Sequence, residues 1–155
     1  MGSGDETTRP PSRPEGEALD LVERTRPGRV SVDLATEATD RLALGDYGGA
    51  LRVAELLLGM RPEHAEALQV ARECREKLEQ MAVSRLGSLR AVPEVAVHGA
   101  ELRWLGLDHR SGFLLSRVDG RNTIEEIIDV SGMTRLETLR TLVELLEAGA
   151  IRVGR

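Results

Sequence analysis

Apolar residues recur every three or four positions through the middle of the chain. That spacing places them on one face of a helix, because an α-helix completes a turn in about 3.6 residues. Gly45 and Pro62 interrupt the pattern and divide it into three parts. We therefore predict three helices, over about residues 32–44, 47–58 and 63–85. Their apolar stripes are Leu34, Ala38, Leu42 and Ala43; Ala50, Val53, Ala54, Leu57 and Leu58; and Leu68, Ala71, Cys74, Leu78 and Met81.

The pattern changes to short segments after the third helix. A connector with Gly87 and Pro93 leads to two stretches, 95–97 and 102–105, which are typical of β-strands. We expect these two strands to be joined by a turn at His98-Gly99.

Three further helices are predicted from residues that commonly start and stop helices. The start signals are Asp108, Asn122 with Glu125 three residues later, and Thr134 with Glu137 three residues later; the stop signals are Asp119-Gly120 and Gly149. The last two helices are joined by the turn 130–133 and form a helix-turn-helix. Residues 150–153 are expected to form a short terminal strand.

The first two helices resemble a tetratricopeptide repeat. The resemblance is carried by the run Leu42-Ala43-Leu44-Gly45-Asp46-Tyr47-Gly48-Gly49-Ala50-Leu51, then Ala54, Leu57-Leu58 and Pro62, with Ala38 at the small position of the first helix. It covers about residues 31–80, which is one repeat and the first helix of a second. It implies a helical hairpin. A lone repeat cannot form the concave groove of longer arrays, so its apolar face must pack elsewhere.

The C-terminal part resembles the small winged-helix-like module of bacterial regulatory and secretion proteins. The resemblance is carried by the run from Leu107 to Gly120, the helix Ile124-Glu125-Glu126-Ile127-Ile128, and Leu145-Leu146-Glu147-Ala148-Gly149-Ala150-Ile151. The same frame is similar to peptide-binding PqqD-like domains and to accessory domains of myxobacterial signalling and motility proteins. It covers about residues 95–153. Such modules serve protein contacts, so the resemblance implies binding and not catalysis.

Together these patterns predict a mainly α fold, with a TPR-like helical hairpin and a small α+β winged-helix-like C-terminal domain. The expected parts are a disordered tail at 1–28, the hairpin with its long third helix at 29–85, a connector at 86–93 and the C-terminal domain at 94–155. Each unit is too small for an independent core. We therefore expect them to pack on one another through the helix 63–85.

Few side chains are of the types that carry catalysis. His64, His98 and His109 lie in different segments, without the spacing of a metal site. Cys74 is the single cysteine, and its place on an apolar stripe predicts a small buried hydrophobe. The glycines at 45, 48 and 49 match neither a Walker loop nor a dinucleotide fingerprint. We predict that the chain is not an enzyme and uses no cofactor or metal.

The net charge of -5 argues against a nucleic-acid partner, which would require an excess of Lys and Arg. A DNA-binding regulator remains an alternative, because helix-turn-helix units often enter the major groove. The recognition helix of such a regulator is expected to expose two arginines against three glutamates, and no wing is expected after Val153. The exposed set would be Arg135, Glu137, Thr138, Arg140, Thr141, Glu144 and Glu147.

The leading hypothesis is a non-enzymatic adaptor of a bacterial signalling, polarity or motility pathway that docks a regulatory protein such as a GTPase or kinase. A peptide-recognition element for a modifying enzyme is a further alternative. Another protein is the expected partner, with a homodimer as an alternative. Candidate partner-binding residues are Tyr47, Ala50, Leu57, Arg103, Trp104, Arg135 and Arg140.

Two of the three aromatic side chains are assigned different roles. Phe113 is expected to anchor the core, whereas Trp104 beside Arg103 is a candidate for an interface centre, where Trp and Arg are over-represented.

No apolar run reaches the roughly 18 residues that span a bilayer, and no signal peptide is evident. We therefore expect no membrane insertion and a cytoplasmic location.

Overall fold

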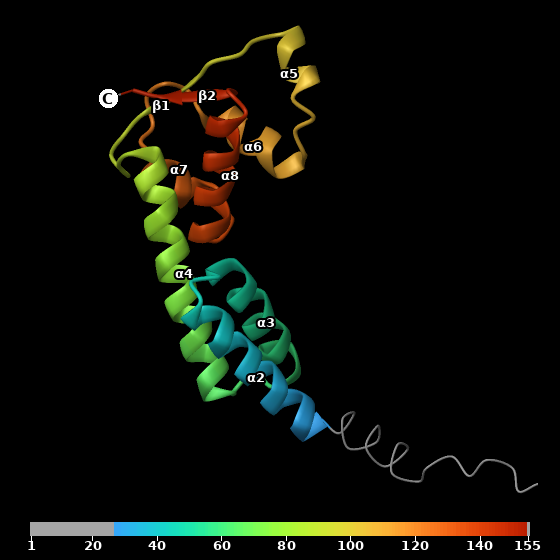
Figure 1. Cartoon of the computed structure of the whole chain (residues 1–155). Coiled ribbons are helices and arrows are strands. Elements are labelled where there is room, and N and C mark those ends of the chain that lie inside the picture. The colour runs from blue at the N-terminus through green and yellow to red at the C-terminus, as the bar shows by residue number, and fades with distance from the viewer. Residues whose placement is uncertain (1–26, 155) are drawn as a thin grey trace, which may run out of the picture.

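The computed structural model describes residues 27–154, and this part of the chain is mainly helical with one small antiparallel sheet (Figure 1). The predicted tail 1–28 therefore lies outside the described residues, except for its last two positions, which begin a helix. The elements are α2 (Pro27–Ala43), α3 (Tyr47–Met60), α4 (Ala65–Leu86), β1 (Pro93–Val95), α5 (Ala100–Trp104), α6 (His109–Arg117), α7 (Ile124–Val130), α8 (Arg135–Glu147) and β2 (Ile151–Val153).

Helices α2 and α3 form a hairpin whose turn is fixed by local chemistry. Gly45 adopts a φ of 79°, in the left-handed region that favours glycine. Asp46 then caps α3 by accepting a hydrogen bond from the Gly49 amide at 3.0 Å. Arg41, in the last turn of α2, pairs with Asp46 at 3.2 Å and so ties the two helices together at the turn.

Small residues let α2, α3 and α4 pack closely. Ala38, Ala50 and Ala54 are all fully buried, as their positions on the apolar stripes predicted. A side chain of one methyl group lets neighbouring helix backbones approach, and larger residues fill the remaining space. This hairpin core contains Ala38, Ala50, Leu51, Ala54, Val70, Ala71, Cys74 and Leu136.

The predicted stripes were wrong at three positions. Ala43, Leu68 and Met81 are exposed. In α4 the buried face instead passes through Ala67 and Val70, because the N-terminal half of this helix lies against α2 and α3 while its C-terminal end faces another core. A single straight stripe cannot describe a helix that is covered by different neighbours along its length.

The second core belongs to the C-terminal module, residues 86–154. Strand β1 pairs antiparallel with β2, with Glu94 opposite Arg152. The end of the module therefore lies beside its beginning. Ala82 and Leu86, from the end of α4, are buried in the same core. The core also contains Leu114, Leu115, Val118, Ile124, Ile127, Ile128, Leu139, Leu142, Leu145, Ala150 and Ile151.

Helix α4 is therefore shared by both cores, in agreement with the predicted role of the helix 63–85. Figure 1 shows α4 running beside the hairpin and then on to α7, α8 and the sheet. Leu136 of α8 completes the contact by packing into the hairpin core. Two ion pairs, Arg135–Glu79 at 3.4 Å and Arg85–Glu147 at 2.8 Å, lie along the same α4–α8 contact.

The C-terminal signals were partly confirmed. Thr134 and Glu137 form the predicted capping box of α8, and Gly149, with a φ of 75°, follows its end. The box of α7 was placed one residue too early, since it is formed by Thr123 and Glu126. Asn122 does not cap α7. Its backbone N–H donates a hydrogen bond to the Asp119 carboxylate at 2.8 Å, inside the preceding turn.

Two other predictions in this module were wrong. The stretch 102–105 is not a strand: most of it lies in the short helix α5, which begins after Gly99, a residue with a φ of 62°. Phe113 is not a core anchor, because it is 39% exposed and the Arg117 guanidinium lies over its ring at 5.1 Å. The buried face of α6 passes instead through its neighbours Leu114 and Leu115.

Candidate functional site

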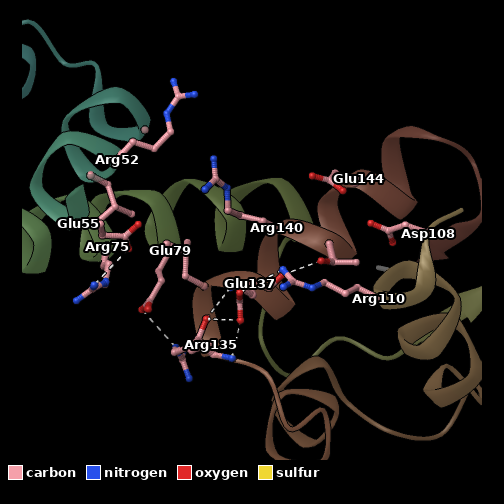
Figure 2. Close-up of a pocket in the computed structure, with 15 residues that line it drawn as sticks. Arg52, Glu55, Arg75, Glu79, Asp108, Arg110, Arg135, Glu137, Arg140 and Glu144 are labelled. Atoms are coloured by element: carbon pink, nitrogen blue, oxygen red, sulfur yellow. Dashed lines mark hydrogen bonds and ion pairs between the residues drawn. The ribbon is translucent and has the colours of Figure 1, made fainter. Parts of the chain in front are cut away.

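A groove of about 840 Å³ lies between the hairpin and the C-terminal module (Figure 2). Helix α3 forms one wall, α8 the other, and α4 and the start of α6 complete it. This inter-module groove is lined by Gly48, Leu51, Arg52, Glu55, Arg75, Glu79, Asp108, Arg110, Thr134, Arg135, Leu136, Glu137, Arg140, Thr141 and Glu144. Its volume falls within the range of about 300–1,000 Å³ typical of binding pockets, but its lining is mostly polar and charged.

Charges of both signs line the groove in equal number, five arginines and five carboxylates. Six of these ten residues are engaged in ion pairs: Arg75 with Glu55 at 3.4 Å, Arg110 with Glu137 at 3.3 Å, and Arg135 with Glu79 at 3.4 Å. Each pair is open to solvent on at least one side and therefore adds little to stability. Their main effect on the groove is to neutralise one another.

Two arginines of the groove are not neutralised in this way. Within residues 27–154, Arg52 and Arg140 make neither an ion pair nor a side-chain hydrogen bond. The Nη2 atom of Arg140 lies 3.9 Å from where a Cβ on Gly48 would stand, so its guanidinium reaches the first turn of α3. Arg52 follows Gly48 by one helical turn on the same helix, and residues four apart share a helix face. Figure 2 shows both side chains pointing to the same side.

Two carboxylates of the groove, Asp108 and the paired Glu137, accept backbone hydrogen bonds. Asp108 caps α6 by accepting a hydrogen bond from the Ser111 amide at 2.8 Å, and this bond lowers the pKa of Asp108. Glu137 accepts from the Thr134 amide at 3.2 Å in the capping box, which lowers the pKa of Glu137. Both side chains are therefore explained by their structural roles as acceptors.

The cap at Asp108 makes a prediction for acid solutions. Its pKa lies below the ordinary value of 3.8, so the cap stabilises the fold fully above that value and is lost as the pH falls through the folded-state pKa. We expect Asp108→Asn to match the wild type at neutral pH, since Asn is an equally good cap. Its melting temperature should fall less steeply between about pH 5 and 2. Circular dichroism melts across that range test this, and identical slopes would contradict it.

A second surface is formed by α5, which buries none of its side chains. Trp104 is 89% exposed and Arg103 beside it is also exposed. The helix is nevertheless held in place, because Leu102 and Leu105 pack against the C-terminal core. Figure 1 shows α5 set apart from the rest of the module.

The structure separates the seven candidate partner-binding residues. Arg135 and Arg140 come together in the inter-module groove, whereas Arg103 and Trp104 lie on α5. The other three candidates belong to the hairpin. Tyr47 is half-buried against the hairpin core, and Ala50 and Leu57 are fully buried.

Ala50 and Leu57 are therefore corrected from contact residues to core residues. A partner cannot touch them without displacing α2 or α4, which lie against α3. Arg52, Arg75 and Arg110 were missed as groove residues. No pattern along the chain marks them, since the groove is assembled from helices far apart in sequence.

The expected recognition helix is also less exposed than predicted. Thr138 and Thr141 of α8 are buried, and the Thr138 hydroxyl lies 2.9 Å from that of Ser131 in the preceding turn. α8 contacts α4, α6, α7 and β2, and its arginines face the hairpin across the groove. The groove beside α8 carries five carboxylates as well as five arginines, so its charged lining has no net positive charge.

Two of the residues considered for catalysis, Cys74 and His64, have structural roles in the fold. Burial raises the pKa of the Cys74 thiol, which is fully enclosed in the hairpin core. His64 caps α4 by accepting a hydrogen bond from the Ala67 amide at 3.2 Å. Over residues 27–154, no cluster of three or more His, Cys, Asp or Glu is placed to hold a metal ion. In the same part of the chain, no helix combines the length and apolarity needed to cross a bilayer.

Comparison with known proteins adds no relative: no family model, curated protein or solved structure matches this chain.

Proposed function

We propose that this chain is a non-enzymatic protein-interaction adaptor that contacts its partner through α5. The observation that carries the proposal is that Trp104 is 89% exposed although Leu102 and Leu105, on either side of it, pack against the C-terminal core. A tryptophan side chain buries about 150–250 Å² when it is covered, so leaving it in water forgoes a large hydrophobic gain.

The neighbouring residue strengthens the proposal. Arg103 is exposed beside Trp104, and Trp and Arg are the side chains most enriched among residues that dominate binding energy. Because Leu102 and Leu105 already anchor α5, a partner that covers Trp104 would not have to order the helix first. A preorganised aromatic side chain is suited to recognising an apolar pocket on another protein.

We further propose that the adaptor acts in a bacterial signalling, polarity or motility pathway and docks a regulatory protein such as a GTPase or kinase. This part rests on the resemblance of residues 95–153 to modules of such proteins. The DNA-binding alternative has less support, since α8 faces the hairpin and the charges of the groove are balanced. A peptide-recognition element stays an alternative within the same class of binding proteins.

Trp104→Ala is expected to weaken partner binding by about thirtyfold or more, the range of an interface hot spot of about 2 kcal/mol. The measurement is affinity capture from a bacterial lysate with and without nuclease, in which each protein captured by the immobilised wild-type chain and by the variants is quantified. Leu44→Ala is the matched control, because Leu44 is an 85% exposed apolar residue far from α5. The same capture yield for all three chains would contradict the proposal, as would a partner lost on nuclease treatment.

A further inference from the structure

We propose that the inter-module groove binds a carboxylate-rich segment of the partner protein, with Arg52 and Arg140 as the two side chains that hold it. The inference rests on the proposed adaptor function and names the chemistry of a second contact, separate from Trp104. It starts from the charge pattern of the groove, where three ion pairs are internally satisfied and two guanidinium groups are not.

The position of the two arginines favours one shared ligand. The Arg140 guanidinium reaches Gly48 on the opposite wall, and Arg52 lies one turn further along the same face of α3. A guanidinium group presents a planar fork of donors that matches a carboxylate through two parallel hydrogen bonds. Two such forks, one from each wall of the groove, can hold acidic side chains of one chain segment.

The carboxylates of the groove distinguish a peptide from a polyanion. Glu144 also lines the groove and makes no ion pair or side-chain hydrogen bond within the described residues, and the paired Glu55, Glu79 and Glu137 line the same groove. A nucleic acid carries a negative charge at every phosphate and would meet these groups along its length. A short acidic peptide needs to occupy only the part of the groove at Arg52 and Arg140, and a longer segment of a partner can place neutral or basic residues at Glu144, so its charges can complement the groove on both signs.

The test uses the purified full chain and a fluorescein-labelled hexaglutamate peptide, with binding followed by fluorescence anisotropy at low ionic strength. Hexaglutamine with the same label is the uncharged comparison. We expect hexaglutamate to bind, and the double variant Arg52→Gln/Arg140→Gln to bind it about tenfold more weakly or worse, as expected for the loss of two partly exposed charge contacts. Binding should also weaken as salt is added, because these contacts are exposed to screening.

A variant with the same change in net charge separates a local site from general attraction. Arg72 and Arg90 are exposed arginines outside the groove, and within residues 27–154 neither side chain has an ion pair or hydrogen bond. Arg72→Gln/Arg90→Gln should bind hexaglutamate within about twofold of the wild type, because distant surface charges contribute little. Equal losses in the two double variants would overturn the proposal, as would hexaglutamate that binds no better than hexaglutamine.

Gly48 allows the groove to be blocked from within. An added Cβ there would stand 3.9 Å from Arg140 Nη2, an ordinary contact distance, so a side chain at this position begins next to that guanidinium group. Gly48→Glu should supply a carboxylate to Arg140 and weaken hexaglutamate binding severalfold, whereas Gly48→Gln, of the same size, should retain it within about twofold. The reverse order, or equal loss in both, would contradict a charge-based site.

Three further outcomes are decisive. Unlabelled tripolyphosphate that displaces the peptide at lower concentration than free hexaglutamate would identify a phosphate site and overturn the peptide assignment. If Trp104-dependent capture succeeds but hexaglutamate does not bind, the adaptor function stands and the acidic-segment proposal fails. If hexaglutamate binds through Arg52 and Arg140 but no partner depends on Trp104, the proposed role of α5 fails and the groove remains a binding site.

Discussion

Ala50→Arg is expected to abolish the cooperative unfolding of the chain. Ala50 is fully buried in α3, where α2 and α4 pack against it, and small side chains set the spacing of the three helices. An arginine would force these helices apart and bury an unpaired charge. That costs several kcal/mol, against a total stability of about 5–15 kcal/mol for a typical domain.

The measurement is urea and thermal denaturation followed by far-ultraviolet circular dichroism. Ala43→Arg is the matched control, because it makes the same substitution at an exposed position in the last turn of α2, where a cation is favoured by the helix dipole. It should unfold within about 0.5 kcal/mol of the wild type, as most surface substitutions do. An Ala50→Arg chain that melts like the wild type would show that this position is not in a packed core.

The burial of Ala50 and Leu57 determines how binding data for variants at these positions are interpreted. Ala50 and Leu57 lie on the apolar face of a helical hairpin, and on sequence alone they are candidates for partner contact. Both side chains are fully buried, so a loss of binding on their substitution reports on folding and not on an interface. Variants at Trp104, Arg52 or Arg140 avoid this difficulty because these side chains are exposed.

Hydrophobic spacing predicted which residues of the hairpin are buried because the signal is local. Ala38, Ala50 and Ala54 follow the helical period, and Gly45 and Asp46 carry the chemistry of the turn. The period does not say what covers a face. The shift of the buried face of α4 away from Leu68 and Met81 depends on which helices lie on either side of it, and that is a tertiary property.

The C-terminal errors have a similar origin. Asn122 and Thr123 each stand three residues before a glutamate, so both fit a capping box. Asp119 determines which residue caps the helix. Its carboxylate accepts a hydrogen bond from the Asn122 backbone N–H, which holds Asn122 in the preceding turn, and Thr123 caps α7. Likewise the short apolar stretch 102–105 suits a strand or a helix equally well, since so few residues do not define a period.

The candidate surfaces differ in how far the sequence predicts them. Trp104 beside Arg103 is visible as an interface candidate from residue type alone, and its exposure is consistent with that prediction. The groove is not visible in this way, because its walls come from α3, α4, α6 and α8. Arg52 becomes notable only when the fold places it near Arg140, a residue more than 80 positions away.

Leu136→Ala is expected to lower the free energy of unfolding by about 2–4 kcal/mol, within the range for truncating a buried leucine. Leu136 is 8% exposed and extends from α8 into the hairpin core, which also contains Val70, Ala71 and Cys74 of α4. Its loss leaves a cavity at the contact between the hairpin and the C-terminal module. Urea denaturation followed by circular dichroism gives the change, with Leu44→Ala, the same substitution at an exposed site, expected to change stability by less than about 0.5 kcal/mol.

The form of that transition tests whether the two cores unfold together. Because α4 contributes Ala71 and Cys74 to one core and Ala82 and Leu86 to the other, neither core can unfold without freeing part of the helix that the other requires. We therefore expect one transition in the wild type and one, at lower urea, in Leu136→Ala. Two separate transitions in the wild type, or a loss confined to one part of the signal in the variant, would mean that α4 does not couple the cores. The groove would then lie between independently moving walls, and Arg52 and Arg140 could not act as one preorganised pair.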